Sequence, residues 1–342
     1  MDKQQKKELL QAMEKAICEK SFYEFFIRAF EIAEPSVPIS VNFHHKYLCD
    51  ILQGEAERIR DNKPKDKDII INIPFRSSKS LLVTVLFPAW CWAVYPKMRF
   101  ITASYSAEIS IEHATKSRDI ISSEWYQKHW GSSFQIKKDQ NLKARYENNY
   151  LGVRRATSVG GSVTGQGGDI ILVDDPTSPK NAASQIEREN ANEWYKSTLY
   201  SRLNNPTTGV RIIIMQRVHE DDLSGYLLFN SPDKHQHICI PAELSSDLKP
   251  SNLADQYQDG LFWKDRFSQE VLDDYKSALG SYGYAGQLQQ RPTPANSGMI
   301  KKSWFKIEEI QKEGVVNFII DPAYTASEKN DPSALLAYVF ED

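Results

Sequence analysis

"INIPFRSSKSLLVTVLFPAW" (residues 71–90) is the stretch of sequence that decides the fold. It reads as the end of an apolar strand, a tight loop that ends in Lys79-Ser80, and an apolar helix. Nucleotide-binding chains carry a phosphate-binding loop in this position. The standard pattern G-x-x-x-x-G-K-[ST] has glycines, whereas residues 74–80 have none. Taken alone, the stretch fits a phosphate loop and a plain strand-to-helix turn with Ser77 as N-cap equally well.

A second apolar strand, "DIILVDDP" (169–176), ends in the carboxylates Asp174 and Asp175. In phosphate-loop enzymes the lysine neutralises charge on the β- and γ-phosphates, and the hydroxyl after it ligates Mg²⁺. Lys79 and Ser80 fit those roles, Asp174 fits a further Mg²⁺ ligand, and Asp175 fits the group that polarises the attacking water. Together the two pieces favour the phosphate loop. The predicted ATP-binding residues are Pro74, Phe75, Arg76, Ser77, Ser78, Lys79 and Ser80.

Apolar runs alternate with helical patterns through the middle of the chain. This alternation predicts an α/β fold with a mostly parallel sheet covered on both faces. Helical patterns also cover residues 1–33 and 43–60, and 268–290 reads as a pair of helices, whereas 123–150 gives no clear assignment. The predicted strands are 68–73, 98–104, 150–157, 169–176 and 209–217, and the predicted helices between them are 106–122, 181–203 and 220–229.

Composition limits the class of protein. The 342 residues carry a net charge of −3, which argues against a uniformly basic coat for nucleic acid but leaves room for a local basic channel. The start of the chain is polar, so no signal peptide is expected. The most apolar run, 81–94, contains Pro88 and is too short to span a membrane. The four cysteines are far apart in sequence, which predicts free thiols in a reducing cytosol.

Five motifs, in order along the chain, resemble those of the large terminase subunit of tailed double-stranded DNA bacteriophages. The first is the loop "PFRSSKS", in which Arg76 stands three residues before the lysine, as in the variant phosphate loop of that family. The resemblance covers residues 43–342 nearly end to end. The other four motifs are "GGSVTGQGGDIILVDDP" (160–176), "IIIMQRVHEDDLSGYLL" (212–228), "YGYAGQLQQRPTPANSGMIKKSWF" (282–305) and "IIDPAYTASEKNDPSALLAY" (319–338).

The resemblance implies an ATP-driven motor that packages double-stranded DNA into a procapsid. It implies a phosphate-loop ATPase of the additional-strand type, with catalytic roles for Lys79, Asp175 and Arg76 and with Mg²⁺ bound together with ATP. The implied partners are the portal protein, a small terminase subunit and further copies of the chain in a homo-oligomeric ring, with no membrane. The expected location is the host cytoplasm during infection rather than the mature virion.

Two departures from the family pattern affect the expected site. Gln216 and Val218 stand where family members often have Thr and Trp, so Gln216 is the candidate for the residue that senses the γ-phosphate and couples hydrolysis to movement. Gln166 stands where the glycine-rich loop often has an arginine. Motor rings usually complete each ATP site with an arginine from the neighbouring subunit. The candidates here are Arg154, Arg155 and Arg202, each of which also fits an ordinary surface residue.

The resemblance also divides the chain. Residues 1–60 are expected to form the N-terminal helical part of the ATPase domain, 61–288 the rest of that domain with its C-terminal helical part, and 289–310 a linker. Residues 311–342 are expected to begin an RNase H-like nuclease domain. Asp321, at a strand end, is the expected ligand of a divalent metal, Mg²⁺ or Mn²⁺, and Asp331 either assists or caps a turn. Because only residues 332–342 follow, we expect an incomplete nuclease site and activity only in a longer chain.

Other interpretations stay open. A helicase-like translocase would share the ATP machinery, and a non-hydrolysing DNA-binding or assembly module would explain the glycine-free loop. Two histidine pairs, His44-His45 and His235/His237, and the run 219–222 resemble metal ligands, although structural roles and a helix start with acidic residues fit better. Two basic runs fit either a solvated surface or contacts with DNA phosphates: Lys63, Lys65 and Lys67, and Lys137, Lys138, Lys143 and Arg145.

Overall fold

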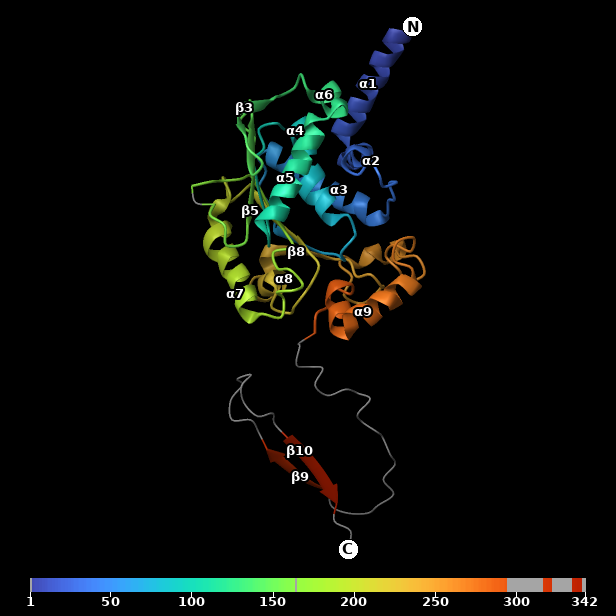
Figure 1. Cartoon of the computed structure of the whole chain (residues 1–342), viewed down its shortest axis with the longest axis vertical. Helices are drawn as coiled ribbons and strands as arrows, with labels where there is room; N and C mark the ends of the chain where they lie inside the picture. The colour runs from blue at the N-terminus through green and yellow to red at the C-terminus, as the bar shows by residue number, and fades with distance from the viewer. Residues whose placement is uncertain (1, 164, 294–315, 322–333, 340–342) are drawn as a thin grey trace. The chain divides into compact units, whose positions relative to one another are not determined.

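A computed structural model describes residues 2–163, 165–293, 316–321 and 334–339 (Figure 1). The chain divides into two compact units, residues 1–295 and 296–342. The first unit holds the predicted phosphate loop and both acidic strand ends. The second contains the strands β9 (Val316–Asp321) and β10 (Ala334–Val339), which pair antiparallel with Asp321 opposite Ala334. Asp331 and most of the predicted linker lie outside the described residues.

The N-terminal part is helical, but the pattern over residues 1–33 forms two helices rather than one. These are α1 (Lys3–Lys20) and α2 (Phe22–Ala33), and α3 (Phe43–Arg60) follows. Ser21 separates the first two because its backbone is extended, with φ of −141°, and its hydroxyl accepts from the N–H of Glu24 as an N-cap. The phenylalanines of α2 are buried, so that face serves packing, as expected.

The first unit is built on a mostly parallel eight-stranded sheet in the order β3-β4-β5-β2-β6-β7-β1-β8. The strand that lies between the phosphate-loop strand β1 and the acidic strand β6 is β7, which follows both of them in sequence. The strand predicted over 98–104, between the two motifs in sequence, is also present as β2 and pairs with β6 on its other side. The strands are β1 (Asp68–Asn72), β2 (Phe100–Ser104), β3 (Ile136–Asn141), β4 (Arg145–Asn148), β5 (Val153–Ser158), β6 (Ile170–Asp174), β7 (Val210–Met215) and β8 (His235–Cys239).

Two hydrophobic cores cover the two faces of this sheet, because alternate strand residues point to opposite faces. On β1, for example, Ile69 and Ile71 belong to one core and Ile70 to the other. Figure 1 shows α2 to α5 on one side of the sheet and α7 and α8 on the other. The helices are α4 (Phe87–Val94), α5 (Ala107–Ser122), α6 (Glu124–Trp130), α7 (Gln185–Trp194), α8 (Leu223–Asn230) and α9 (Gln269–Gln287), with a π-helical turn, η1 (Leu81–Leu86), before α4.

The structure corrects several of the predicted elements. The unassigned segment 123–150 contains α6 and the antiparallel pair β3–β4, and β8 was missed. The helix predicted over 181–203 is shorter and continues as a π-helical turn (Tyr195–Leu199) and a 3-10 turn (Tyr200–Arg202). The helix pair predicted over 268–290 is present, because α9 consists of two helical segments separated at Gly280, where φ is 66° and ψ is 173°. All four cysteines are free thiols, as the sequence predicts, and all four are buried. Among the described residues, no helix is long and apolar enough to cross a bilayer.

Candidate active site

The loop without glycines adopts backbone angles that glycine usually supplies. Arg76 has φ of 58° and Ser78 has φ of 60°, both in the left-handed region. Each costs about 1 kcal/mol in an L-residue, so something must hold the loop. Part of that support is local, because the buried Ser77 hydroxyl donates to the Pro74 carbonyl at 2.7 Å. Phe75 packs its ring against Tyr275 of α9 at 5.0 Å between centroids.

Lys79 and Asp175 form an ion pair at the end of the loop. The Lys79 ammonium is 2.9 Å from Asp175 Oδ2, and the lysine side chain is only 7% exposed. Asp175 has φ of 43°, and its Oδ1 accepts from the backbone N–H of Gln216 at 3.1 Å. These contacts join the loop after β1 to the ends of β6 and β7. The parallel order β6-β7-β1 brings these carboxyl ends to one edge of the sheet, where open α/β sheets bind ligands.

Asp174 is buried beside this pair and accepts hydrogen bonds from two hydroxyls. Ser80 donates to Oδ1 at 3.1 Å and Thr84 donates to Oδ2 at 2.9 Å. Burial raises the pKa of both Asp174 and Asp175, and the Lys79 charge opposes that shift. His113 Nδ1 of α5 lies 3.5 Å from Asp174 Oδ2, and burial lowers the pKa of His113 to about 4, so the ring is neutral at pH 7.

The oxygen atoms at this edge suit a Mg²⁺ ion. Mg²⁺ binds through one or two carboxylates, hydroxyls, water and substrate phosphates. Ser80 and Asp174 present a hydroxyl and a carboxylate in contact with each other, next to the loop expected to hold phosphates. The donor set therefore fits the predicted ion.

Sequence reasoning missed Thr84 and His113, which contact Asp174 from η1 and α5. Neither stands in a motif, and only the folded chain brings them to Asp174. Gln216, the predicted sensor, is 7% exposed, and its side-chain carbonyl has no hydrogen-bond partner within the described residues. Its backbone N–H nevertheless contacts Asp175, so its side chain starts beside the predicted water-polarising group.

The three candidate arginines differ in accessibility. Arg154 is 1% exposed and donates to the Thr84 carbonyl at 2.6 Å and to the Ser117 hydroxyl at 3.3 Å. Burial lowers its pKa. A guanidinium that is held inside its own subunit cannot reach the ATP site of a neighbouring subunit. Arg154 is therefore removed from the candidate arginines. Arg155 and Arg202 are partly exposed and stay candidates.

The histidine pairs have partners within the protein. His44 bonds to Asn42 and Ser77, His45 to Asn42, His235 to the Ser231 carbonyl and His237 to Asn72. These bonds support the structural interpretation of both pairs. The basic runs are also partly paired, with ion pairs to acidic residues at Lys63, Lys65, Lys137 and Arg145.

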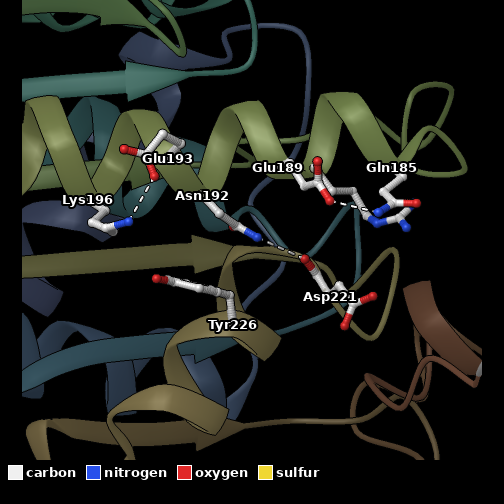
Figure 2. A pocket seen from close by; sticks show the side chains of 8 residues that line it. Gln185, Glu189, Asn192, Glu193, Lys196, Asp221 and Tyr226 are labelled. Atoms are coloured by element: carbon white, nitrogen blue, oxygen red, sulfur yellow. Dashed lines mark hydrogen bonds and ion pairs between the residues drawn. The ribbon is translucent and has the colours of Figure 1, made fainter.

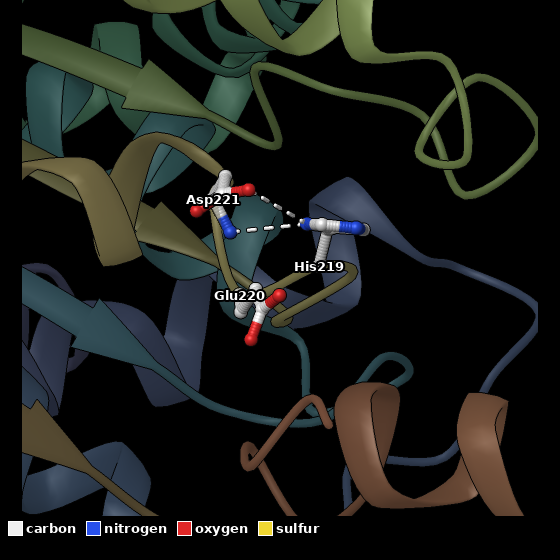
Figure 3. A group of neighbouring side chains, drawn as sticks. All are labelled: His219, Glu220 and Asp221. Atoms are coloured by element: carbon white, nitrogen blue, oxygen red, sulfur yellow. Dashed lines mark hydrogen bonds and ion pairs between the residues drawn. The ribbon is translucent and has the colours of Figure 1, made fainter. Parts of the chain in front are cut away.

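The run 219–222 starts a helix. Asp222 is the N-cap of α8, where it accepts from the N–H of Gly225 and pairs with the Arg217 guanidinium at 2.9 Å. Ligand atoms of His219, Glu220 and Asp221 do lie within 4.8 Å of one another (Figure 3). However, His219 Nδ1 accepts from the N–H of Asp221, and the two carboxylates are exposed. The geometry therefore favours the helix start over the metal site.

A separate cavity of about 380 Å³ lies between α7 and the start of α8 (Figure 2). The Asn192 side chain crosses it to donate to the Asp221 carbonyl at 3.1 Å. Its lining mixes both signs of charge, with Arg188 and Lys196 beside Glu189 and Glu193. None of the predicted nucleotide-site residues lines it, so it is separate from the site at the sheet edge.

Of three comparisons with known proteins, the one with solved structures finds matches. No model of a known protein family matches the sequence, and no curated protein matches it. Several large terminases of bacteriophages are similar in structure. The HK97 protein is 13% identical with a TM-score of 0.48, covering 79% of this chain and 55% of that one. The large terminase of a thermophilic bacteriophage, in complex with ADP, is 11% identical with a TM-score of 0.38, covering 69% and 51%.

A mutant ATPase domain of the large terminase from Thermus phage P74-26 is 8% identical with a TM-score of 0.46, covering 77% of this chain and 98% of that one. The chain thus spans about half the length of the HK97 protein and of the ADP-bound protein. Identities and TM-scores this low assign no activity and no residue to this chain.

The hydrogen bond from Thr84 to the buried Asp174 can be tested by isosteric replacement. Thr84→Val removes the hydroxyl that donates to this carboxylate. We expect the free energy of unfolding to fall by about 2 kcal/mol. The matched control is Thr102→Val, because Thr102 is equally buried but donates to the Arg155 backbone carbonyl. There the expected loss is about 1 kcal/mol, because the acceptor is neutral. Denaturant unfolding measures both, and equal losses would contradict the role given to Thr84.

Proposed function

We propose that the first unit is a Mg²⁺-dependent ATPase and that the chain is a large terminase subunit that packages double-stranded DNA. The observation that carries the ATPase is the pairing of Lys79 with Asp175 and of Ser80 with Asp174 at one sheet edge. The buried Lys79 and Asp174, with the half-buried Asp175, are costly to desolvate. A site for a highly charged ligand gives a reason for keeping them there. The motor role rests on the sequence motifs that resemble those of terminases.

In this proposal each residue has a distinct task. Lys79 exchanges Asp175 for the β- and γ-phosphates of ATP and stabilises the charge that develops during transfer. Asp175, whose Oδ1 is held by the Gln216 N–H, orients and polarises the attacking water. Bound Mg²⁺ supplies further neutralisation of phosphate charge, and Ser80 and Asp174 are the residues that hold it. Gln216 senses the γ-phosphate, and Arg76, which is exposed at the loop surface, acts with Lys79.

The partners follow from the motor role. We propose a ring of copies on the procapsid that contacts the portal protein and a small terminase subunit, in the host cytoplasm during infection. Arg155 or Arg202 would complete the ATP site of a neighbouring copy. The nuclease stays a prediction of the sequence, with Asp321 at the end of β9 as the candidate metal ligand.

The alternatives are separated by activity. The non-hydrolysing module loses support because the lysine and both carboxylates converge despite the missing glycines. A helicase-like translocase stays consistent with the ATP site. Strand separation on a forked duplex distinguishes it, since a packaging motor moves along double-stranded DNA without unwinding it.

Lys79→Ala should abolish ATP turnover while the chain stays folded. Removal of a cation that stabilises transition-state charge costs several kcal/mol in barrier, on the order of 10³-fold or more in rate. Steady-state ATPase assays and thermal unfolding measure the two effects. Lys46→Ala is the matched control, because Lys46 is an exposed lysine that pairs with Asp50. A well-folded Lys79→Ala protein with the wild-type rate would refute the assignment.

The two carboxylates should separate by role. Asp174→Ala should weaken binding of Mg²⁺-ATP, because a metal ligand is lost. Asp175→Asn should bind nucleotide but hydrolyse it at least about 10²-fold more slowly, because an amide cannot accept a proton from water. Titration with a fluorescent ATP analogue and turnover assays distinguish these effects. Normal hydrolysis by Asp175→Asn would remove Asp175 from its role.

A further inference from the structure

His44 of α3 contacts the phosphate loop through one ring nitrogen and the helix N-cap, Asn42, through the other. Its ring is fully buried, with Nε2 3.0 Å from the Ser77 carbonyl oxygen and Nδ1 3.1 Å from Asn42 Nδ2. Asn42 Nδ2 also donates to the Phe262 carbonyl, which can only accept, so the orientation of that amide is fixed. Nδ1 therefore accepts, and Nε2 carries the hydrogen and donates to Ser77.

This bond controls the direction of a peptide group in the loop. In a planar trans peptide the carbonyl and the following N–H point in opposite directions. With the Ser77 carbonyl turned towards His44 and α3, the N–H of Ser78 points the opposite way, away from α3. Phosphate loops bind their anion through backbone N–H groups aimed in this manner.

The loop has a way to relax that the His44 bond opposes. Ser78 is strained at φ of 60°. Rotation of the 77–78 peptide plane by about 180° would bring φ of Ser78 to about −120°, in the relaxed β region. The same rotation would also turn the Ser77 carbonyl oxygen towards the side that the Ser78 N–H now faces. An anion on that side would then meet an oxygen instead of an N–H group. A glycine at position 78 would have no strain to relieve.

We propose that His44 is a positioning residue of the phosphate loop, which replaces the missing glycines by holding the Ser77–Ser78 peptide in its strained, anion-binding orientation. The part of this proposal that concerns nucleotide affinity rests on the proposed ATPase function, whereas the part that concerns loop conformation does not. His44 is fixed in place by neighbouring rings, with centroid distances of 5.3 Å to Phe262 and 5.2 Å to Trp263.

The chain offers a matched control in the next residue. His45 is equally buried in the same aromatic cluster, 5.2 Å from the Phe26 ring and 5.1 Å from the Trp263 ring. Its Nδ1 accepts from the Asn42 N–H and caps the start of α3. The hydrogen bonds shown for His45 do not involve the loop. His44→Phe and His45→Phe therefore make the same change in the same cluster, but only the first removes a bond to the phosphate loop.

The test compares the His44→Phe, His44→Gln and His45→Phe variants of the 342-residue chain by hydrogen–deuterium exchange over residues 74–80. We expect exchange in His44→Phe to be about tenfold faster than in His45→Phe, since one hydrogen bond is lost. His44→Gln keeps an N–H near Nε2 and should approach the wild type. Equal exchange in the two phenylalanine variants would overturn the proposal, whether or not the protein binds nucleotide.

Nucleotide binding gives the second measurement. His44→Phe should raise the Kd for a fluorescent ATP analogue and the KM for ATP by about tenfold with little change in kcat, because the loop grips the phosphates in ground and transition states alike. The Ser78→Gly background should shrink that effect, because the strain is gone. If His44→Phe still raised Kd and KM by about tenfold in the Ser78→Gly background, the proposed mechanism would be contradicted. If the wild type binds no ATP, the proposed function fails, and the exchange rates still decide the role of His44.

Discussion

The buried carboxylate of Asp174 is the constraint on which the rest of the site depends. Its side chain is 1% exposed, and a buried charge persists only when hydrogen bonds and opposite charges compensate it. Ser80 and Thr84 supply two hydrogen bonds, and the Lys79 ammonium lies close enough to oppose the effect of burial on its pKa. The loop after β1, the turn η1 and the end of β6 are therefore tied to one another through a single side chain.

In the same way, contacts with the surrounding structure compensate for the strained backbone of the glycine-free loop. Arg76 and Ser78 accept strained backbone angles because the surrounding structure determines the position of the loop. The Ser77 hydroxyl fixes one end of the turn, and α3 supports it from behind through His44. The buried Arg154 holds the carbonyl of Thr84 in η1, where the π-helical turn departs from regular helix bonding. Contacts from segments that are distant in sequence therefore stabilise the irregular backbone of this site.

The sequence predicts the central strands well because fully buried parallel strands are continuous apolar runs. It predicts the edge strands poorly, since "IKKDQN" in β3 and "HQHIC" in β8 are polar and lack that signal. The meeting of Lys79 with Asp175 could be anticipated from strand ends, but the contacts of Thr84, His113 and His44 could not. Likewise, neighbouring strand residues point to opposite faces, yet only the packing of α5 shows that Arg154 is the buried one of the pair 154–155.

A structure determined with Mg²⁺ and a non-hydrolysable ATP analogue tests the central claim most directly. The account predicts that the phosphates lie in the loop 74–80, that the Lys79 ammonium leaves Asp175 for the β- and γ-phosphate oxygens, and that Mg²⁺ contacts Ser80 with Asp174 nearby. An analogue bound elsewhere, such as in the cavity between α7 and α8, with Lys79 still paired to Asp175, would contradict it.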